Sequence, residues 1–122
     1  MNKNIIYIKS YEFALKIVKL NKKLTSEKKE FVLSKQLLRS GTAIAALVRE
    51  SKFAQSKLDF INKMSIGLKE ANETLYWLEL LHDSEYIENE DFEIIHSDCN
   101  ELVSIMVSII KSTKSSLDKN NS

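Results

Sequence analysis

The stretch Gln36–Leu81, QLLRSGTAIAALVRESKFAQSKLDFINKMSIGLKEANETLYWLELL, contains the clearest evidence for the fold of this chain. It contains no proline, and it is typical of two long helices joined by a turn near Ala54. In its second half, apolar residues recur at alternating spacings of three and four, which indicates a helix that faces a helical core. These residues are Ile61, Met64, Leu68, Ala71, Leu75 and Leu78. We therefore expect an antiparallel helical hairpin at the centre of the molecule.

The opposite side of the same helix predicts contact with a second chain. Around Leu75–Leu81 the sequence is apolar nearly all round the helix, and such helices are usually buried on more than one side. A four-helix protein of this size cannot cover both sides by itself. The predicted oligomer-interface residues are Ile66, Glu70, Glu73, Trp77 and Leu80.

The only two glycines, Gly41 and Gly67, both fall within the predicted hairpin. Each costs about 1 kcal/mol relative to alanine inside a helix, so a compensating reason is expected. With the turn near Ala54, the two glycines would lie at the same level. The sequence therefore predicts that the two helices of the hairpin approach closely there. The alternative is two tolerated glycines without a role.

Two further helices flank the hairpin and complete an all-α fold. Residues 4–24 form the first, and we predict that Ile8, Tyr11, Leu15 and Val18 are its core-facing seam, widened by Ile5, Ala14 and Ile17. The last helix begins near residue 89 and carries a seam of Phe92, Ile95, Cys99, Leu102, Met106 and Ile109. Short connections between four helices favour antiparallel neighbours. We expect an antiparallel up-down four-helix bundle over residues 1–111 and a frayed or disordered tail over residues 112–122.

Polar residues at the connections indicate where the helices begin. Thr25 and Ser26 are expected to cap the second helix, which runs to about residue 52. Ser56 followed by Asp59 resembles a capping box and begins the third helix, which ends near residue 82. Asn89 is expected to cap the fourth.

Three segments carry a resemblance to a known family. They are LRSGTAI at 38–44, SKLDFINK at 56–63 and LKEANETLYWLELL at 68–81. The chain resembles the bacterial four-helix-bundle family called 23S rRNA intervening-sequence proteins over about residues 8–115. The family is similar in fold to the accessory protein of diversity-generating retroelements. The resemblance implies an up-down four-helix protomer, a ring-shaped homopentamer and a link to nucleic acid. One departure is Leu47, which stands where the family usually carries an asparagine, so no function is carried onto that position.

Charge is distributed unevenly along the chain, although the net charge is only +1. Residues 1–69 hold 13 lysines and 2 arginines against 5 acidic residues, and residues 70–122 hold 3 lysines against 12 acidic residues. One interpretation is that basic and acidic helices neutralise each other within a single bundle. Another is that the basic helices of one chain face the acidic helices of the next in a head-to-tail ring, around Trp77 and Leu80.

A cluster of lysines on the first helix and the following turn is the predicted nucleic-acid-binding surface. Repeated around a ring, it could neutralise many phosphates. Nearby aromatic residues that could stack on bases are few, and Tyr11 is expected to lie in the core. The lysines are Lys9, Lys16, Lys19, Lys22, Lys23, Lys28 and Lys29. A lysine-rich solvated face is the alternative.

The sequence contains one pattern that resembles a metal site. Glu79-x-x-His82 and Glu93-x-x-His96 on adjacent antiparallel helices match part of a di-iron bundle. Glu93 is expected to face water, however, and the first helix offers lysines at that level. We therefore predict no metal, no cofactor and no catalytic residue.

The remaining sequence features favour a non-catalytic cytoplasmic protein. No signal peptide and no apolar run of membrane-spanning length is present, and Cys99 is expected to be a small buried residue. We expect a homo-oligomeric, ring-forming bundle, pentameric by resemblance, that binds RNA or DNA electrostatically through its basic first and second helices. The alternative is a structural scaffold that docks a protein partner. Neither a membrane nor a small-molecule substrate is expected as a partner.

Overall fold

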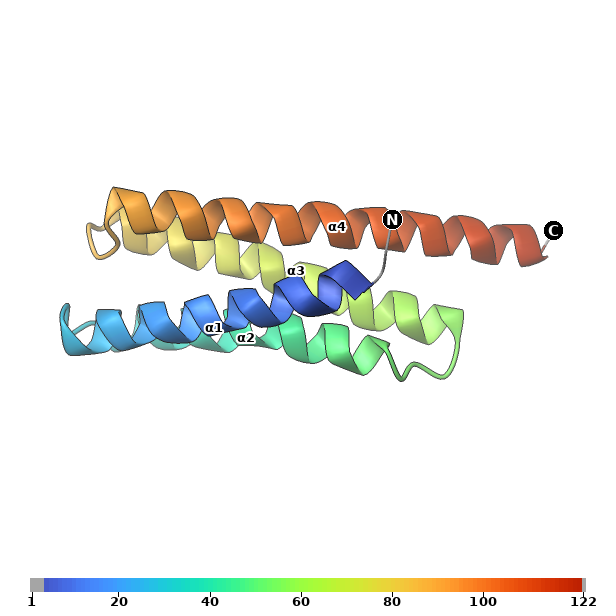
Figure 1. Cartoon of the computed structure of the whole chain (residues 1–122), viewed down its shortest axis with the longest axis horizontal. Coiled ribbons are helices and arrows are strands. Elements are labelled where there is room, and N and C mark those ends of the chain that lie inside the picture. Colours follow the sequence, from blue (N-terminus) through green and yellow to red (C-terminus); the bar gives the residue numbers. More distant parts are fainter. Residues whose placement is uncertain (1–3, 122) are drawn as a thin grey trace.

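Four antiparallel helices make up the part of the chain that the computed structural model describes, residues 4–121, with side chains described to residue 118 (Figure 1). The helices are α1 (Asn4–Ser26), α2 (Leu33–Ser51), α3 (Lys57–Asp83) and α4 (Asn89–Asn121). Each helix contacts the next, and α1 also contacts α4, so that α1 and α3 lie on one diagonal of the bundle. The predicted all-α, up-down four-helix bundle is confirmed.

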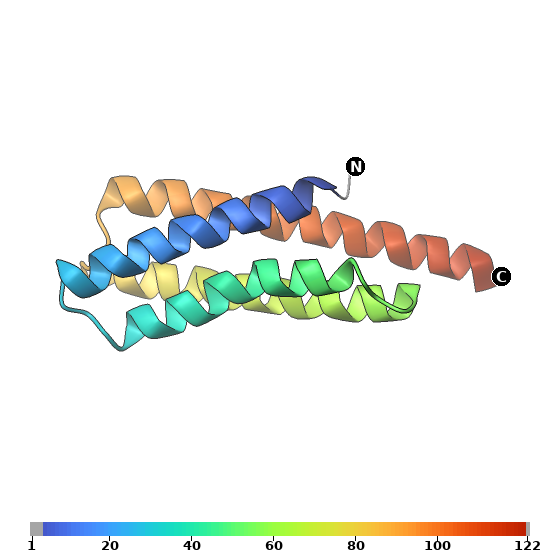
Figure 2. The same ribbon diagram turned by 60° about the horizontal axis from the view of Figure 1, so that its bottom comes forward.

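The two ends of the bundle differ in the turns they carry and in the length of α4. The α1–α2 and α3–α4 turns lie together at one end, and the α2–α3 turn lies at the other, near the start of α1 (Figure 2). The last turns of α4 extend past the other helices at this second end (Figure 1).

The core is formed by one apolar stripe from each helix. On α3 the predicted seam is confirmed: Ile61, Met64, Ala71 and Leu78 are buried, and the other two members pack against them from half-buried positions. The largest side chains with almost no exposure include Ile6, Ile17, Leu37, Ile44, Leu102 and Met106. Burial of these side chains is the main stabilising contribution to the fold.

The predicted seam of α1 is wrong. Its four central residues are exposed by 36 to 60%, and the buried stripe lies on the opposite side of the helix. Of the three residues expected to widen the seam, only Ile17 is fully buried. That buried stripe consists of Ile6, Ser10, Phe13, Ile17, Leu20 and Leu24. Both stripes have the three-and-four spacing of an amphipathic helix, so spacing alone cannot say which one faces α2 and α4. As a result, α1 presents a second apolar face to solvent.

The turn between α1 and α2 also differs from the prediction. Thr25 and Ser26 belong to α1, where their hydroxyls donate to carbonyls of the preceding turn at 3.0 and 2.7 Å. The cap of α2 is Glu30, whose carboxylate accepts from the backbone N–H groups of residues 32, 33 and 34 at 2.7 to 3.1 Å. Lys29 adopts a left-handed φ of 55°. A Thr-Ser pair can end one helix or cap the next, so it does not locate the boundary.

The Glu30 carboxyl is buried by this cap, and two opposing effects act on its pKa. Burial, the largest single effect, raises the pKa, but the hydrogen bonds from Ser34, Val32 and Leu33 together hold it below its usual range. The carboxylate is therefore more favourable in the folded state than in the unfolded chain. This contribution to stability is present above the unfolded pKa of about 4.3 and is lost as the pH falls below it.

Replacing Glu30 by glutamine is expected to lower the free energy of unfolding by about 1 kcal/mol at pH 7, as for other lost helix caps. The difference from wild type should shrink as the pH falls below about 4 and through the lower pKa of the folded carboxyl. Urea unfolding at a fixed protein concentration and several pH values measures both effects. Glu27→Gln, at an exposed position on the same turn, is the control and should have little effect at either pH. If the free energy of unfolding of Glu30→Gln stays below that of the wild type even at low pH, the capping role is contradicted.

The capping box at the start of α3 is confirmed, whereas the predicted cap of α4 is not. The Ser56 hydroxyl accepts from the Asp59 N–H at 3.0 Å, and the Asp59 carboxylate accepts from the Gln55 N–H at 3.1 Å. Asn89 is the first residue of α4, and its side-chain oxygen lies 2.6 Å from Nε2 of His82. It therefore links the two ends of the α3–α4 turn.

The segment from residue 112 onward, predicted to fray, continues α4 as a helix to Asn121. Thr113 is buried, with its hydroxyl bonded to the Ile109 carbonyl at 2.8 Å, and Leu117 packs against the core. The loss of apolar periodicity in the sequence reflects the overhang of α4, where few side chains have neighbouring helices to contact.

The predicted close approach of α2 and α3 at the two glycines is wrong, because the close contact at Gly41 is with α1. A Cβ atom at Gly41 would lie 2.9 Å from both γ carbons of Ile17. At Gly67 the nearest atoms are Met106 Sδ at 3.6 Å and Leu47 Cβ at 3.7 Å, which are ordinary contact distances. Only Gly41 is therefore needed for helix packing.

Candidate nucleic-acid and assembly interface

Four of the seven lysines predicted to bind nucleic acid form ion pairs with α4 or the residue before it. The N–O distances run from 2.5 to 3.0 Å, and the pairs are Lys9–Glu101, Lys16–Asp98, Lys23–Asp91 and Lys28–Glu88. Lys9, Lys16 and Lys23 are seven residues apart, which places them along one side of α1. The interpretation that basic and acidic helices neutralise each other within one bundle is confirmed.

These pairs are exposed, so they contribute little to stability. Surface ion pairs are generally worth about 0 to 1 kcal/mol each and weaken with salt. The hydrogen bond and charge of Asp91 raise the pKa of Lys23, and those of Lys28 lower the pKa of Glu88. Both shifts favour the charged forms. The main consequence of the four pairs is that these lysines are already partly neutralised.

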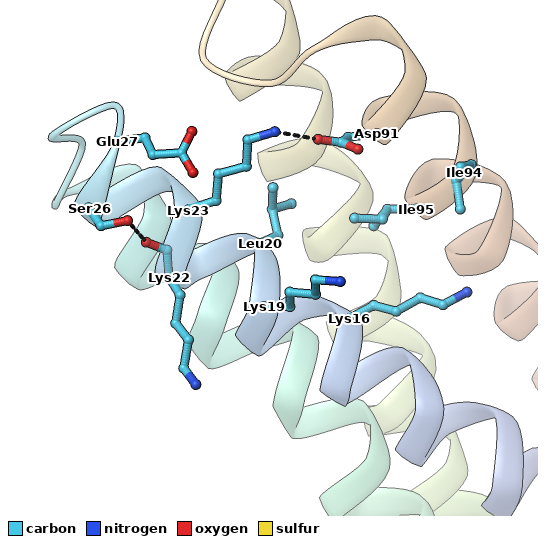
Figure 3. A pocket seen from close by; sticks show the side chains of 10 residues that line it. All are labelled: Lys16, Lys19, Leu20, Lys22, Lys23, Ser26, Glu27, Asp91, Ile94 and Ile95. Atoms are coloured by element: carbon cyan, nitrogen blue, oxygen red, sulfur yellow. Dashed lines mark hydrogen bonds and ion pairs between the residues drawn. The ribbon is translucent and has the colours of Figure 1, made fainter.

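The other three predicted lysines, Lys19, Lys22 and Lys29, are exposed and form no ion pair within the described part of the chain. Lys19 and Lys22 line a groove of about 520 Å³ between α1 and α4, with Leu20, Ile94 and Ile95 also in its lining (Figure 3). Lys23 reaches across to Asp91 while Lys22 points away from it (Figure 3). Among the seven predicted lysines, those that remain available to a polyanion therefore lie in the second half of α1 and on the α1–α2 turn.

The outward face of α1 is the largest unexpected feature of the surface. We call Ile8, Tyr11, Leu15 and Val18 the outer stripe; their exposed fractions are 60, 52, 55 and 36%. Tyr11 is thus exposed rather than buried as predicted, and the Arg49 guanidinium lies 5.9 Å from its ring centre. Next to the outer stripe, a groove of about 730 Å³ runs between α1 and α2. Its lining combines the small residues Ala14, Thr42, Ala45 and Ala46 with larger aromatic and charged side chains.

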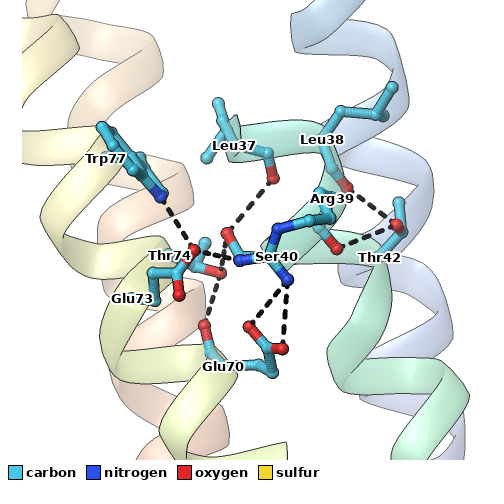
Figure 4. Close-up of polar contacts among 9 residues, drawn as sticks. All are labelled: Leu37, Leu38, Arg39, Ser40, Thr42, Glu70, Glu73, Thr74 and Trp77. Atoms are coloured by element: carbon cyan, nitrogen blue, oxygen red, sulfur yellow. Dashed lines mark hydrogen bonds and ion pairs between the residues drawn. The ribbon is translucent and has the colours of Figure 1, made fainter. Parts of the chain in front are cut away.

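The predicted interface residues on α3 fall into two groups. Ile66 is 46% exposed, and Trp77 and Leu80 are half-buried, so an apolar surface is present there. Glu70 and Glu73, in contrast, are held by Arg39 of α2, which donates to both carboxylates (Figure 4). The indole N–H of Trp77 also donates to Glu73, at 3.1 Å.

This polar network links α2 to α3 along the outside of the bundle. The bond from Trp77, the largest favourable effect, and the charge of Arg39 hold the pKa of Glu73 below its usual range, although partial burial acts against them. Beneath the network, the buried hydroxyls of Ser40 and Thr74 are 2.9 Å apart (Figure 4). Such directional bonds fix the relative position of two helices. The two acids therefore have partners within the chain before any second chain is considered.

The Glu-x-x-His pattern does not assemble a metal site among the described residues. Glu79 and His96 contact each other directly at 2.9 Å, His82 contacts Asn89, and Glu93 is exposed. Within residues 4–118, no group of three or more His, Cys, Asp or Glu side chains is placed to hold a metal ion.

Cys99 is buried on α4, and its thiol lies 3.4 Å from the Ala71 carbonyl oxygen. Burial, with a smaller effect from the charge of Asp98, raises the pKa of this thiol to about 12. The thiol is therefore neutral at pH 7, as expected for a small packing residue and not for a nucleophile.

None of the helices, over the described residues, is both long and apolar enough to cross a membrane.

Comparison with known proteins gives a family and a similar structure. The family profile described as 23S rRNA-intervening sequence protein matches residues 2–108. A crystal structure of a protein with unknown function from the S23 ribosomal protein family of Bacteroides thetaiotaomicron is 57% identical in sequence, with a TM-score of 0.89. The alignment covers 91% of this chain and 99% of that one. No curated protein matches the chain.

Proposed function

The chain belongs to the 23S rRNA-intervening sequence protein family, and we propose that it is a non-catalytic, ring-forming homo-oligomer that binds RNA or DNA electrostatically. A pentamer is the ring size that the family resemblance implies. The single observation that supports assembly best is the outer stripe of α1. Four apolar side chains at heptad-like spacing, all exposed on one face of a helix, are typical of a surface that another helix covers.

The position of α1 in the bundle favours a head-to-tail arrangement. Because α1 and α3 lie on one diagonal, their outward faces point in opposite directions. A contact between the outer stripe of one copy and the α3 surface around Ile66, Trp77 and Leu80 of the next joins two different faces. Contacts of this kind produce closed rings when the rotation between copies is suitable.

Charge contributes less to this assembly than the sequence suggested. Lys9, Lys16 and Lys23 are paired within their own chain, so they have less attraction for a neighbour. The apolar surfaces on α1 and α3 are then the main source of affinity between copies. We therefore expect the ring to persist at high salt, in contrast to one held by ion pairs.

Light scattering on a size-exclusion column, at low and high salt, tests the assembly directly. A mass of several times the 14.1 kDa of one chain, at both salt concentrations, is the expected result. Absorbance at 260 and 280 nm in the same run reports nucleic acid that stays bound. A single-chain mass at micromolar concentration would contradict the proposal.

Replacing Lys19, Lys22 and Lys29 together by glutamine is expected to weaken binding of a single-stranded RNA by tenfold or more at low salt. The expected reason is the loss of phosphate contacts, which also makes the dependence of log K on log[salt] less steep. Fluorescence anisotropy with a labelled 20-nucleotide RNA measures both quantities. Lys69, Lys111 and Lys114, which are exposed and unpaired in the described chain, provide a control triple with the same change in charge. Equal losses of RNA affinity in the two triple variants would argue against a defined nucleic-acid-binding surface.

A structural scaffold that docks a protein partner is the second candidate. The groove between α1 and α2 favours it, because small residues allow another helix to approach closely and Phe53, 77% exposed, lies at its end. This function predicts no retention of RNA at any salt concentration. The anisotropy experiment therefore separates the two candidates.

A further inference from the structure

A second polar cleft lies at the opposite end of the bundle from the lysines of the α1–α2 turn. Its volume is about 510 Å³, within the range of about 300 to 1,000 Å³ that is common for small-ligand sites. It is bounded by the start of α1, the end of α2, the start of α3 and the overhanging part of α4. Its main polar groups are those of Lys52, Ser56, Lys57, Ser112 and Ser116.

The two lysines of this cleft have no carboxylate partner within the described residues. The Lys57 ammonium donates to the Ser116 hydroxyl at 2.7 Å, which is a neutral partner. The Lys52 ammonium lies 5.5 Å from the ring centre of Tyr7, which also lines the cleft. The carboxylate of Asp59, on the adjoining turn, accepts from the Gln55 N–H and is not part of the lining. The cleft therefore carries two positive charges that no acidic group in its lining balances.

The serine hydroxyls add hydrogen-bond donors to these charges. Ser56 accepts from the Asp59 N–H, and Ser116 accepts from Lys57, so both hydroxyl protons remain available to a ligand. The Ser112 hydroxyl is exposed beside them. Ser51 and Thr113 also line the cleft, but their protons are used by backbone carbonyls. Two ammonium groups and three hydroxyl donors therefore face a space without a carboxylate.

We propose that the cleft formed by Lys52, Ser56, Lys57, Ser112 and Ser116 binds a phosphate group. A phosphate oxyanion needs several donors and positive charge around it, and lysines and hydroxyls supply both. The phosphate belongs either to a small phosphomonoester or to the backbone of a nucleic acid. Because this cleft lies at the other end of the bundle, phosphate binding in it does not depend on Lys19, Lys22 and Lys29.

The test is ³¹P NMR of inorganic phosphate titrated with the full chain at constant ionic strength. Saturable line broadening is expected with the wild type, and Lys52→Gln/Lys57→Gln should weaken the apparent affinity by tenfold or more. Both side chains are exposed, so the pair is expected to fold normally, which circular dichroism can check. Lys69→Gln/Lys111→Gln removes the same charge elsewhere and should keep the wild-type affinity.

Competition then identifies the source of the phosphate. Displacement by uridine monophosphate, but not by an unphosphorylated UpU dinucleotide, would identify a terminal phosphomonoester, and displacement by UpU would identify a nucleic-acid backbone. Either result supports the proposal. Absence of saturable broadening in the wild type, or equal weakening in the two double variants, would overturn it. The Lys19/Lys22/Lys29 triple variant is expected to bind phosphate as the wild type does, which separates this site from the proposed nucleic-acid surface.

Discussion

Replacing Leu15 by aspartate is expected to convert the assembled protein into single chains. Leu15 lies in the middle of the outer stripe and is 55% exposed in the isolated chain. A carboxylate there would have to be desolvated opposite an apolar surface, and unpaired buried charges are strongly unfavourable. Light scattering at micromolar concentration should then give a mass of 14.1 kDa. The free energy of unfolding of the single chain should change by no more than about 0.5 kcal/mol, as is usual at exposed positions.

The matched control is Ile94→Asp, because Ile94 is 57% exposed on α4 and belongs to neither proposed contact face. It should leave the assembly intact. Trp77→Asp changes the opposite face of the proposed contact and should also produce single chains. If Leu15→Asp assembles like the wild type while Trp77→Asp does not, the α3 surface alone takes part and the outer stripe has another role.

Replacing Gly41 by alanine is expected to destabilise the protein by about 1 to 2 kcal/mol, although alanine is the better helix former. The new methyl group would lie 2.9 Å from two carbons of Ile17, a fully buried and β-branched side chain that cannot move aside easily. Overpacking of this kind costs about 1 to 3 kcal/mol, which exceeds the gain of about 1 kcal/mol in helix propensity. Thermal unfolding should show a lower midpoint than that of the wild type.

Gly67→Ala is the matched control, and the opposite sign is expected for it. A Cβ atom there meets only ordinary contacts, so the gain in helix propensity should stabilise the protein by up to about 1 kcal/mol. The Ile17→Ala change removes the side-chain carbons that a methyl group at position 41 would contact. The double variant should therefore be more stable than the sum of the two single changes predicts. If the changes in the free energy of unfolding are additive, the contact with Ile17 is not the cause of the destabilisation by Gly41→Ala.

The candidate site was only partly predictable from the sequence. Of the seven lysines predicted to bind nucleic acid, four have carboxylate partners, three of them on α1 and the fourth, Lys28, on the turn that follows, since α1 and α4 contact each other. Likewise, Glu70 and Glu73 are neutralised by Arg39. Which charges remain available depends on distances between residues that are 31 to 92 positions apart in the chain. Sequence patterns that extend over a few residues cannot predict which of these distant residues form ion pairs.

The amino-acid sequence is sufficient to predict the number of helices, the approximate bounds of α3 and the core stripe of that helix. These features follow from local periodicity and from capping residues such as Ser56 and Asp59, which act over three or four positions. The family resemblance is also visible in the sequence alone, in segments that form the α2–α3 hairpin.

Which face of each helix is covered, and how the helices contact each other, depends on the packing of the whole bundle. On α1 two apolar stripes satisfy the same periodicity, and packing against α2 and α4 selects the one that contains Ile17. The role of Gly41 was assigned to the wrong pair of helices for the same reason. Periodicity specifies that a helix has an apolar face, but the neighbouring helices determine which face is buried, because burial depends on contacts between residues that are distant in the sequence.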